Sequence, residues 1–141
     1  MVVNYTKLTK EENIYKLLNI VDCLQPDRSK TTTHAEKKVL VELLLLPEEQ
    51  FGIYRFTKYA RKRILESSKQ KGWDLSPRNM MNRFRSLREK GLIYKQADGE
   101  MYVKKWLLKA CNKMLEALEK GEHYEIKFRF SDERNPEGST V

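Results

Sequence analysis

The chain alternates between stretches whose apolar residues repeat every three or four positions and short polar breaks. Two of these stretches open on a capping box, a hydroxyl followed three residues later by a glutamate, at Thr9 and at Thr33. They predict a helix over 9–24 and a second helix from Thr33 that Pro47 ends. The second helix is the most apolar in the chain, so we expect it at the centre of the core.

Three further helices follow from their start and stop signals. Thr57 can cap a helix that ends at Gly72, and Ser76 with the proline after it begins another that ends at Gly91. An apolar stripe predicts the last helix over 106–120. Five helices therefore account for most of the chain.

Short β-prone stretches lie between and after these helices. Residues 51–56 are aromatic and predict a short strand. Residues 92–94 and 101–103 flank the tight-turn dipeptide Asp98-Gly99 and predict an antiparallel hairpin. Residues 124–130 alternate between apolar and charged, which predicts a C-terminal strand. Such a strand needs a partner, either this chain's own sheet or the edge of a neighbour.

From Thr33 to Lys105 the predicted order is helix, short strand, helix, helix, strand, turn, strand. This order, with the motif SPRNMMNRFRSLREKGLI, resembles the winged helix-turn-helix family of DNA-binding domains over about half the chain. The expected fold is mainly α with a small β-hairpin (α+β), a winged helix-turn-helix with flanking N- and C-terminal helices and a C-terminal strand. The expected organisation is an N-terminal helix and linker (1–32), a winged-helix domain (33–105), a C-terminal helix and strand (106–130) and a polar tail (131–141).

The distribution of charge along the chain indicates a class of partner. The chain holds 28 Lys and Arg against 20 Asp and Glu, a net charge of +8. Residues 51–110 hold 16 against 5, a net of +11, whereas residues 1–50 hold 7 against 8 and residues 111–141 hold 5 against 7. A polyanion suits such a field, so we expect a nucleic acid partner, most simply duplex DNA. RNA binding through the same face is an alternative.

The helix that begins at Ser76 supplies the candidate base contacts. Met80, Phe84 and Leu87 fall on one of its faces, and the opposite face is polar. Arginine pairs with guanine and asparagine with adenine in bidentate fashion, in a groove that fits one helix. The predicted base readers are Arg78, Asn79, Asn82 and Arg85. Arg83, nearer the edge of the apolar face, better suits a phosphate, and Ser86 completes the predicted DNA-binding residues of this helix. Solvation of an exposed helix face is the alternative interpretation.

Two neighbouring elements add candidate phosphate contacts. The preceding helix, 57–71, contributes Lys58, Arg61 and Lys62, which would position the protein without reading sequence. In winged-helix proteins the hairpin touches the minor groove or the backbone, and the resemblance implies this role for Lys95, Gln96, Lys104 and Lys105. The segment between the two motif helices is longer than the usual turn and contains Trp73, which can stack on a base or fill an apolar notch.

No motif in the sequence indicates an enzyme, a cofactor or a metal site. His34 and His123 are isolated, and no phosphate-binding glycine loop is present. Cys23 and Cys111 are expected to be reduced, buried thiols of a cytoplasmic protein. No apolar run approaches the length of a membrane helix and no secretory signal is recognised, so we expect no membrane partner and a cytoplasmic location, or a host cytoplasm or virion for a viral protein.

The sequence therefore predicts a non-enzymatic DNA-binding protein, sequence-specific or general, acting as a transcriptional regulator or a replication accessory factor. The alternative is a structural or assembly subunit of a virion or large complex, whose winged-helix-like domain makes protein–protein contacts. A homo-oligomer or larger assembly could form through 9–24, 106–120 or strand 124–130. Packing of the two flanking helices on the chain's own core is the simpler account.

Overall fold

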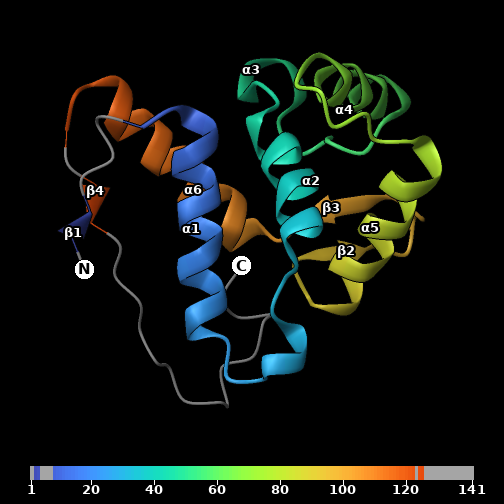
Figure 1. The fold of residues 1–141 in the computed structure, drawn as a ribbon, viewed down its shortest axis with the longest axis horizontal. Helices are drawn as coiled ribbons and strands as arrows, with labels where there is room; N and C mark the ends of the chain where they lie inside the picture. Colours follow the sequence, from blue (N-terminus) through green and yellow to red (C-terminus); the bar gives the residue numbers. More distant parts are fainter. Residues whose placement is uncertain (1, 4–7, 123, 126–141) are drawn as a thin grey trace.

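A computed structural model describes residues 2–3, 8–122 and 124–125 of the chain. It is mainly helical with a small antiparallel hairpin, as the sequence predicts (Figure 1). The elements are β1 (Val2–Val3), α1 (Lys10–Leu24), a 3-10 helix (Arg28–Lys30), α2 (His34–Leu45), α3 (Glu48–Phe51), α4 (Lys58–Gln70), α5 (Pro77–Glu89), β2 (Ile93–Lys95), β3 (Met101–Val103), α6 (Lys105–Glu119) and β4 (Tyr124–Glu125).

Local capping explains where the long helices begin. The Thr9 hydroxyl accepts from the Glu12 amide at 3.1 Å, and the Glu12 carboxylate accepts from the Thr9 amide at 3.0 Å. Thr33 and Glu36 make the same reciprocal pair at 3.2 and 2.8 Å, so both predicted capping boxes form. A single side chain caps each of the next two long helices, Thr57 on α4 and Ser76 on α5.

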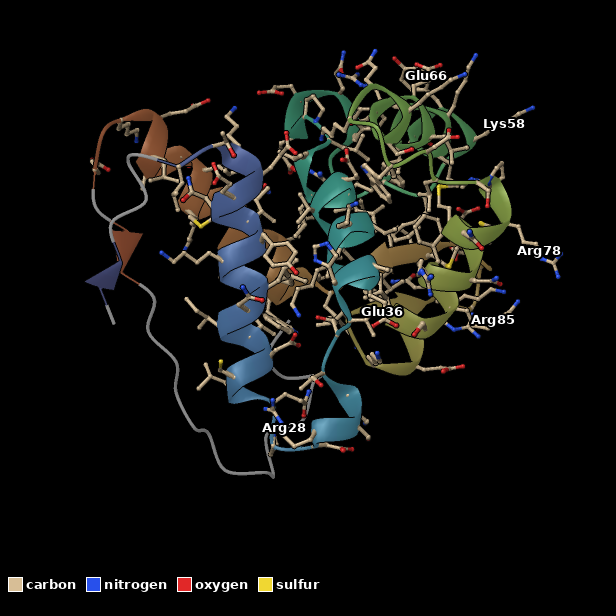
Figure 2. The ribbon with its side chains drawn as sticks, in the orientation of Figure 1. Arg28, Glu36, Lys58, Glu66, Arg78 and Arg85 are labelled. Atoms are coloured by element: carbon tan, nitrogen blue, oxygen red, sulfur yellow. The ribbon has the colours of Figure 1, made fainter. Side chains whose placement is uncertain are left out.

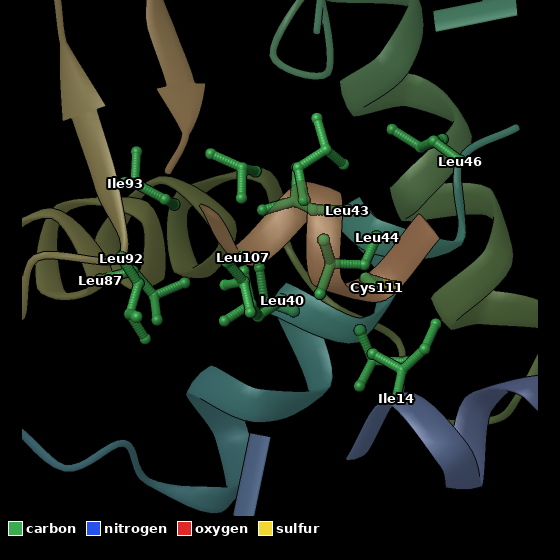
Figure 3. Close-up of a cluster of buried hydrophobic side chains, with 14 of the residues drawn as sticks. Ile14, Leu40, Leu43, Leu44, Leu46, Leu87, Leu92, Ile93, Leu107 and Cys111 are labelled. Carbon is green, nitrogen blue, oxygen red and sulfur yellow. The ribbon is translucent and has the colours of Figure 1, made fainter. Parts of the chain in front are cut away.

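One buried cluster joins the helices, with α2 at its centre (Figures 1 and 3). The side chains of Leu40 and Leu43 on α2 are fully buried, as are Ile14 on α1, Leu87 on α5 and Leu107 on α6. Helix α2 lies between α1 on one side and α4 and α5 on the other. The two flanking helices, α1 and α6, thus pack against the chain's own core.

The hairpin and a second short ladder complete the fold. Strands β2 and β3 pair antiparallel, with Ile93 opposite Val103 and Tyr94 opposite Tyr102. Ile93 and Val103 are buried, which leaves the two tyrosines on the other face of the hairpin. Strand β4 pairs with β1 at the N-terminus. Only the first two residues of the predicted strand 124–130 belong to the described part of the chain, and the predicted tail 131–141 lies outside it.

The predicted strand over 51–56 is wrong. Residues 48–51 form the short helix α3, and the chain then turns at Gly52, whose φ is +53°. The side chain of Arg55 is fully buried and donates to the carbonyl oxygens of Leu43 at 2.9 Å and Leu46 at 2.7 Å, at the end of α2. These bonds hold the segment as a turn against α2 and override its β propensity.

The two cysteines differ in their surroundings. Cys111 is buried, as predicted, and burial raises the pKa of its thiol to about 12 although Arg55 acts in the opposite direction. Cys23 is exposed, contrary to prediction, because it lies on the side of α1 opposite Ile14. Among the described residues, no helix is both long enough and apolar enough to cross a membrane.

Candidate nucleic-acid interface

Helix α5 presents one apolar face to the core and one polar face to the outside. Met80, Phe84 and Leu87 are each at most 2% exposed, and the ring of Phe84 lies edge-on to Phe56 with centroids 4.9 Å apart. The opposite side leaves five polar side chains exposed: Arg78, Asn79, Asn82, Arg85 and Glu89. We call the first four the outer face of α5, and Glu89 adds one negative charge at its C-terminal end. Figure 2 shows Arg78 and Arg85 pointing away from the body of the protein.

A buried carboxylate holds α5 against α2. Ser86 Oγ and Lys90 Nζ both donate to the carboxylate of Glu36, which is 3% exposed. Burial raises the pKa of Glu36, but the hydrogen bonds from Lys90, Ser86 and the Thr33 amide outweigh it, so the pKa lies below its ordinary value. The hydroxyl of Ser86, predicted to bind DNA, is therefore engaged inside the protein. Arg83 is also half-buried rather than fully outward.

Helix α4 carries three exposed lysines, and one of its arginines packs against α5. Lys58 and Lys62 are exposed, and Lys58 projects on the same side of the molecule as Arg78 (Figure 2). Arg61 is half-buried, with Nη1 4.0 Å from the sulfur of Met81 on α5. Its Nε is buried and has no hydrogen-bond partner in the part of the chain that the structure describes. Arg61 thus lies along the α4–α5 contact, and the predicted phosphate contacts of α4 that are accessible are Lys58 and Lys62; Lys69, in the last turn, is exposed as well.

The hairpin residues surround a shallow hollow at the C-terminal end of α5. Lys95 and Gln96 are exposed, and Lys104 is half-buried with Nζ 5.2 Å from the centre of the Tyr94 ring. The hollow measures about 560 Å³, and Arg88 of α5 lines it beside Lys95, Gln96 and Lys104. None of the described residues that line it is acidic. Lys105, predicted with this group, is exposed at the first position of α6.

Trp73 fills a notch instead of projecting outward. The ring is half-buried against the core, and Lys38 Nζ of α2 lies 4.3 Å from its centre. Of the two roles considered for this residue, the contacts favour packing. The long segment between α4 and α5 is thereby fixed to α2.

Two features of this region were not predicted from the sequence. Glu36 appeared there only as part of a capping box, and its partner Ser86 lies 50 positions away, so no local pattern connects them. The tyrosines at 94 and 102 did carry a signal. They alternate with the apolar residues at 93 and 103, and this period of two places them on the outer face of a hairpin.

Comparison of the chain with protein-family models, with curated proteins and with solved structures finds no match. Within the described residues, no three His, Cys, Asp or Glu side chains gather into a potential metal site. The arrangement of α4, α5 and the hairpin is therefore the basis for a functional assignment. These elements offer exposed cations and amides suited to an anionic polymer.

Proposed function

We propose that the protein binds duplex DNA without catalysing a reaction, as a transcriptional regulator or a replication accessory factor. In this proposal α5 enters the major groove. The observation that carries it is the outer face of α5, with Arg78, Asn82 and Arg85 exposed on a helix whose other side is buried in the core. The major groove admits a helix of this diameter, and Arg and Asn are the side chains that bond guanine and adenine in bidentate fashion.

The neighbouring elements would supply phosphate contacts. Lys58 and Lys62 are exposed on α4, Lys58 on the same side of the molecule as Arg78 (Figure 2), and the hairpin adds Lys95 and Gln96. Lys104 and Lys105 would follow at the start of α6. Contacts of this kind set the position of a protein on the duplex and make its affinity fall steeply with salt.

The element order supports a winged helix-turn-helix assignment. Helices α2, α4 and α5 and strands β2 and β3 follow one another as the three helices and the wing of that family do. The short strand expected between the first two helices is replaced by α3 and its turn, so the wing of this protein would have two strands.

Titration of duplex DNA against ionic strength, followed by fluorescence anisotropy, tests the proposal. With duplexes selected from a random pool, we expect Arg78→Ala and Arg85→Ala each to lose about 1–3 kcal/mol of discrimination between preferred and altered sites. Lys62→Ala should weaken all duplexes alike and lower the slope of log Kd against log salt by about 1. Lys16→Ala on α1 is the matched control, because it removes an exposed charge away from these elements.

Three outcomes would contradict the proposal. They are absence of binding at low salt, binding that is indifferent to salt, and equal effects of Lys62→Ala and Lys16→Ala. Duplex RNA in competition would show whether the ligand is DNA. Assembly into rings or larger particles that bind no DNA would instead support the alternative function as an assembly subunit.

A further inference from the structure

Three tyrosine rings form a continuous row across the outer face of the hairpin. Tyr94 and Tyr102 are cross-strand neighbours with ring centroids 5.6 Å apart. Tyr54, from the turn between α3 and α4, meets Tyr102 edge-on at 6.4 Å. Tyr102 is covered at 8% exposure, whereas Tyr54 is 59% exposed and Tyr94 half-buried. Tyr54 and Tyr94 are therefore the accessible rings of this tyrosine row.

Positive charge gathers at one end of the tyrosine row. The hollow lined by Arg88, Lys95 and Lys104 adjoins Tyr94, and the ammonium of Lys104 lies over the face of that ring. The opposite charge lies at the hairpin turn, where Asp98 Oδ2 is 3.5 Å from the hydroxyl of Tyr102. Tyr54 lies at the other end of the row, beyond Tyr102. An anionic chain that uses both accessible rings would accordingly place its phosphates at the hollow beside Tyr94 and extend past Tyr102 to Tyr54.

Packing alone explains only part of this surface. A cross-strand aromatic pair stabilises a hairpin, which accounts for Tyr94 and Tyr102. It does not account for the exposure of Tyr54, nor for three cations around a hollow without a lining carboxylate. Exposed aromatic rings next to a cationic groove are the surface on which unpaired bases stack while their phosphates are neutralised.

We propose that the tyrosine row and the adjoining hollow bind a single-stranded stretch of DNA. Bases stack on Tyr54 and Tyr94, and Arg88 and Lys95 contact the phosphates. The inference rests on the proposed function and sharpens it, since α5 would hold the duplex while the hairpin holds an unpaired strand. The preferred ligand is then a duplex with a single-stranded extension.

Anisotropy titrations with three labelled DNAs test this inference: a blunt duplex, the same duplex with an overhang of about ten thymidines, and the overhang strand alone. The expected result is tighter binding of the overhang duplex than of the blunt one. Because stacking on an aromatic side chain contributes about fivefold to 150-fold in affinity per base, Tyr54→Ala should remove a preference of that size. Tyr54→Ala should leave binding of the blunt duplex unchanged, and Tyr54→Phe should keep the preference.

Tyr59→Ala is the matched control, because Tyr59 is 61% exposed but stacks on Phe51 away from the row. Arg88→Ala, on α5 beside the hollow, is a second variant that does not alter the row and should also reduce the preference. Equal affinity for blunt and overhang duplexes, or equal losses in Tyr54→Ala and Tyr59→Ala, would overturn the inference. So would a clear preference for an overhang of RNA.

The two proposals fail in different ways. If the wild-type protein binds the single strand, Tyr54→Ala weakens that binding and the blunt duplex is not bound, the proposed role of α5 is refuted. The proposed role of the tyrosine row then stands. Wild-type protein that binds both duplexes equally, with Arg78→Ala weakening both, would refute the role of the row and leave that of α5 intact.

Discussion

At the scale of single residues, Arg55 has the most consequences for the fold. It is the largest fully buried side chain in the described part of the chain, and it carries a charge. Its guanidinium donates to the carbonyls of Leu43, Leu46 and Gly52 and pairs with the Glu48 carboxylate. The last carbonyls of a helix have no partners within it, and a cation there meets the negative end of the helix dipole. Arg55 therefore closes the end of α2.

We expect Arg55→Ala to lower the free energy of unfolding by about 3 kcal/mol, since it leaves buried carbonyls without donors and opens a cavity. Glu48→Gln should cost less than about 1 kcal/mol, because the Glu48 side chain is 52% exposed and the carbonyls keep their donor. Urea denaturation followed by circular dichroism measures both. Equal losses of unfolding free energy in the two variants would mean that Arg55 stabilises the protein through its ion pair with Glu48 and not through its hydrogen bonds to the end of α2.

Arg55 also shows why residues 51–56 were predicted incorrectly. Their composition favours a strand, and nothing within six residues argues otherwise. The decisive partners are backbone carbonyls on α2, nine and twelve positions earlier. Backbone carbonyls exist at every position, so no sequence pattern identifies the ones that a buried arginine will meet.

At the scale of elements, helices whose first turn is fixed by neighbouring residues were predictable. Helices α1, α2, α4 and α5 begin within one residue of the expected positions because their caps are local. The outward direction of Arg78 and Arg85 was predictable as well, because it follows from the apolar spacing of α5. The docking of α5 on α2 through Glu36 was not, since it depends on tertiary structure.

The contacts of Glu36 predict how its contribution to the free energy of unfolding depends on pH. The pKa of Glu36 is lowered on folding, so its carboxylate contributes fully above the ordinary value of 4.5 and loses that contribution as the pH falls through the lowered folded value. At pH 7, Glu36→Gln should cost about 2 kcal/mol, as expected for charged hydrogen bonds. The difference in unfolding free energy between wild type and variant should shrink as the pH is taken below 4.5.

Glu66→Gln is the control for this experiment, because Glu66 is an exposed carboxylate on α4 (Figure 2). It should change the free energy of unfolding by no more than about 0.5 kcal/mol. A difference between wild type and Glu36→Gln that stays constant from pH 7 to pH 3 would show that the carboxylate charge does not hold α5 in place.

At the scale of the whole molecule, the flanking helices and the candidate DNA-binding elements share one core. The buried cluster extends from Ile14 on α1 to Met114 on α6. Lys71, at the end of α4, adds polar ties, with Nζ 3.1 Å from the Glu11 carboxylate on α1 and 2.7 Å from that of Glu42 on α2. Helices that share a continuous buried cluster and ion pairs unfold together in a single cooperative transition.

We therefore expect α1 to unfold together with α5 and the hairpin. Ile14→Val removes one fully buried methylene, so it should lower the free energy of unfolding by about 1 kcal/mol and the Tm by roughly 4 °C. Circular dichroism, which follows all helices, and the fluorescence of Trp73 and Trp106 should shift by the same amount. Ile20→Val, at a half-buried position of the same helix, should shift both less. A separate early transition in circular dichroism, with fluorescence unmoved, would instead mean that α1 is an independent unit whose loss leaves the α4–α5 surface intact.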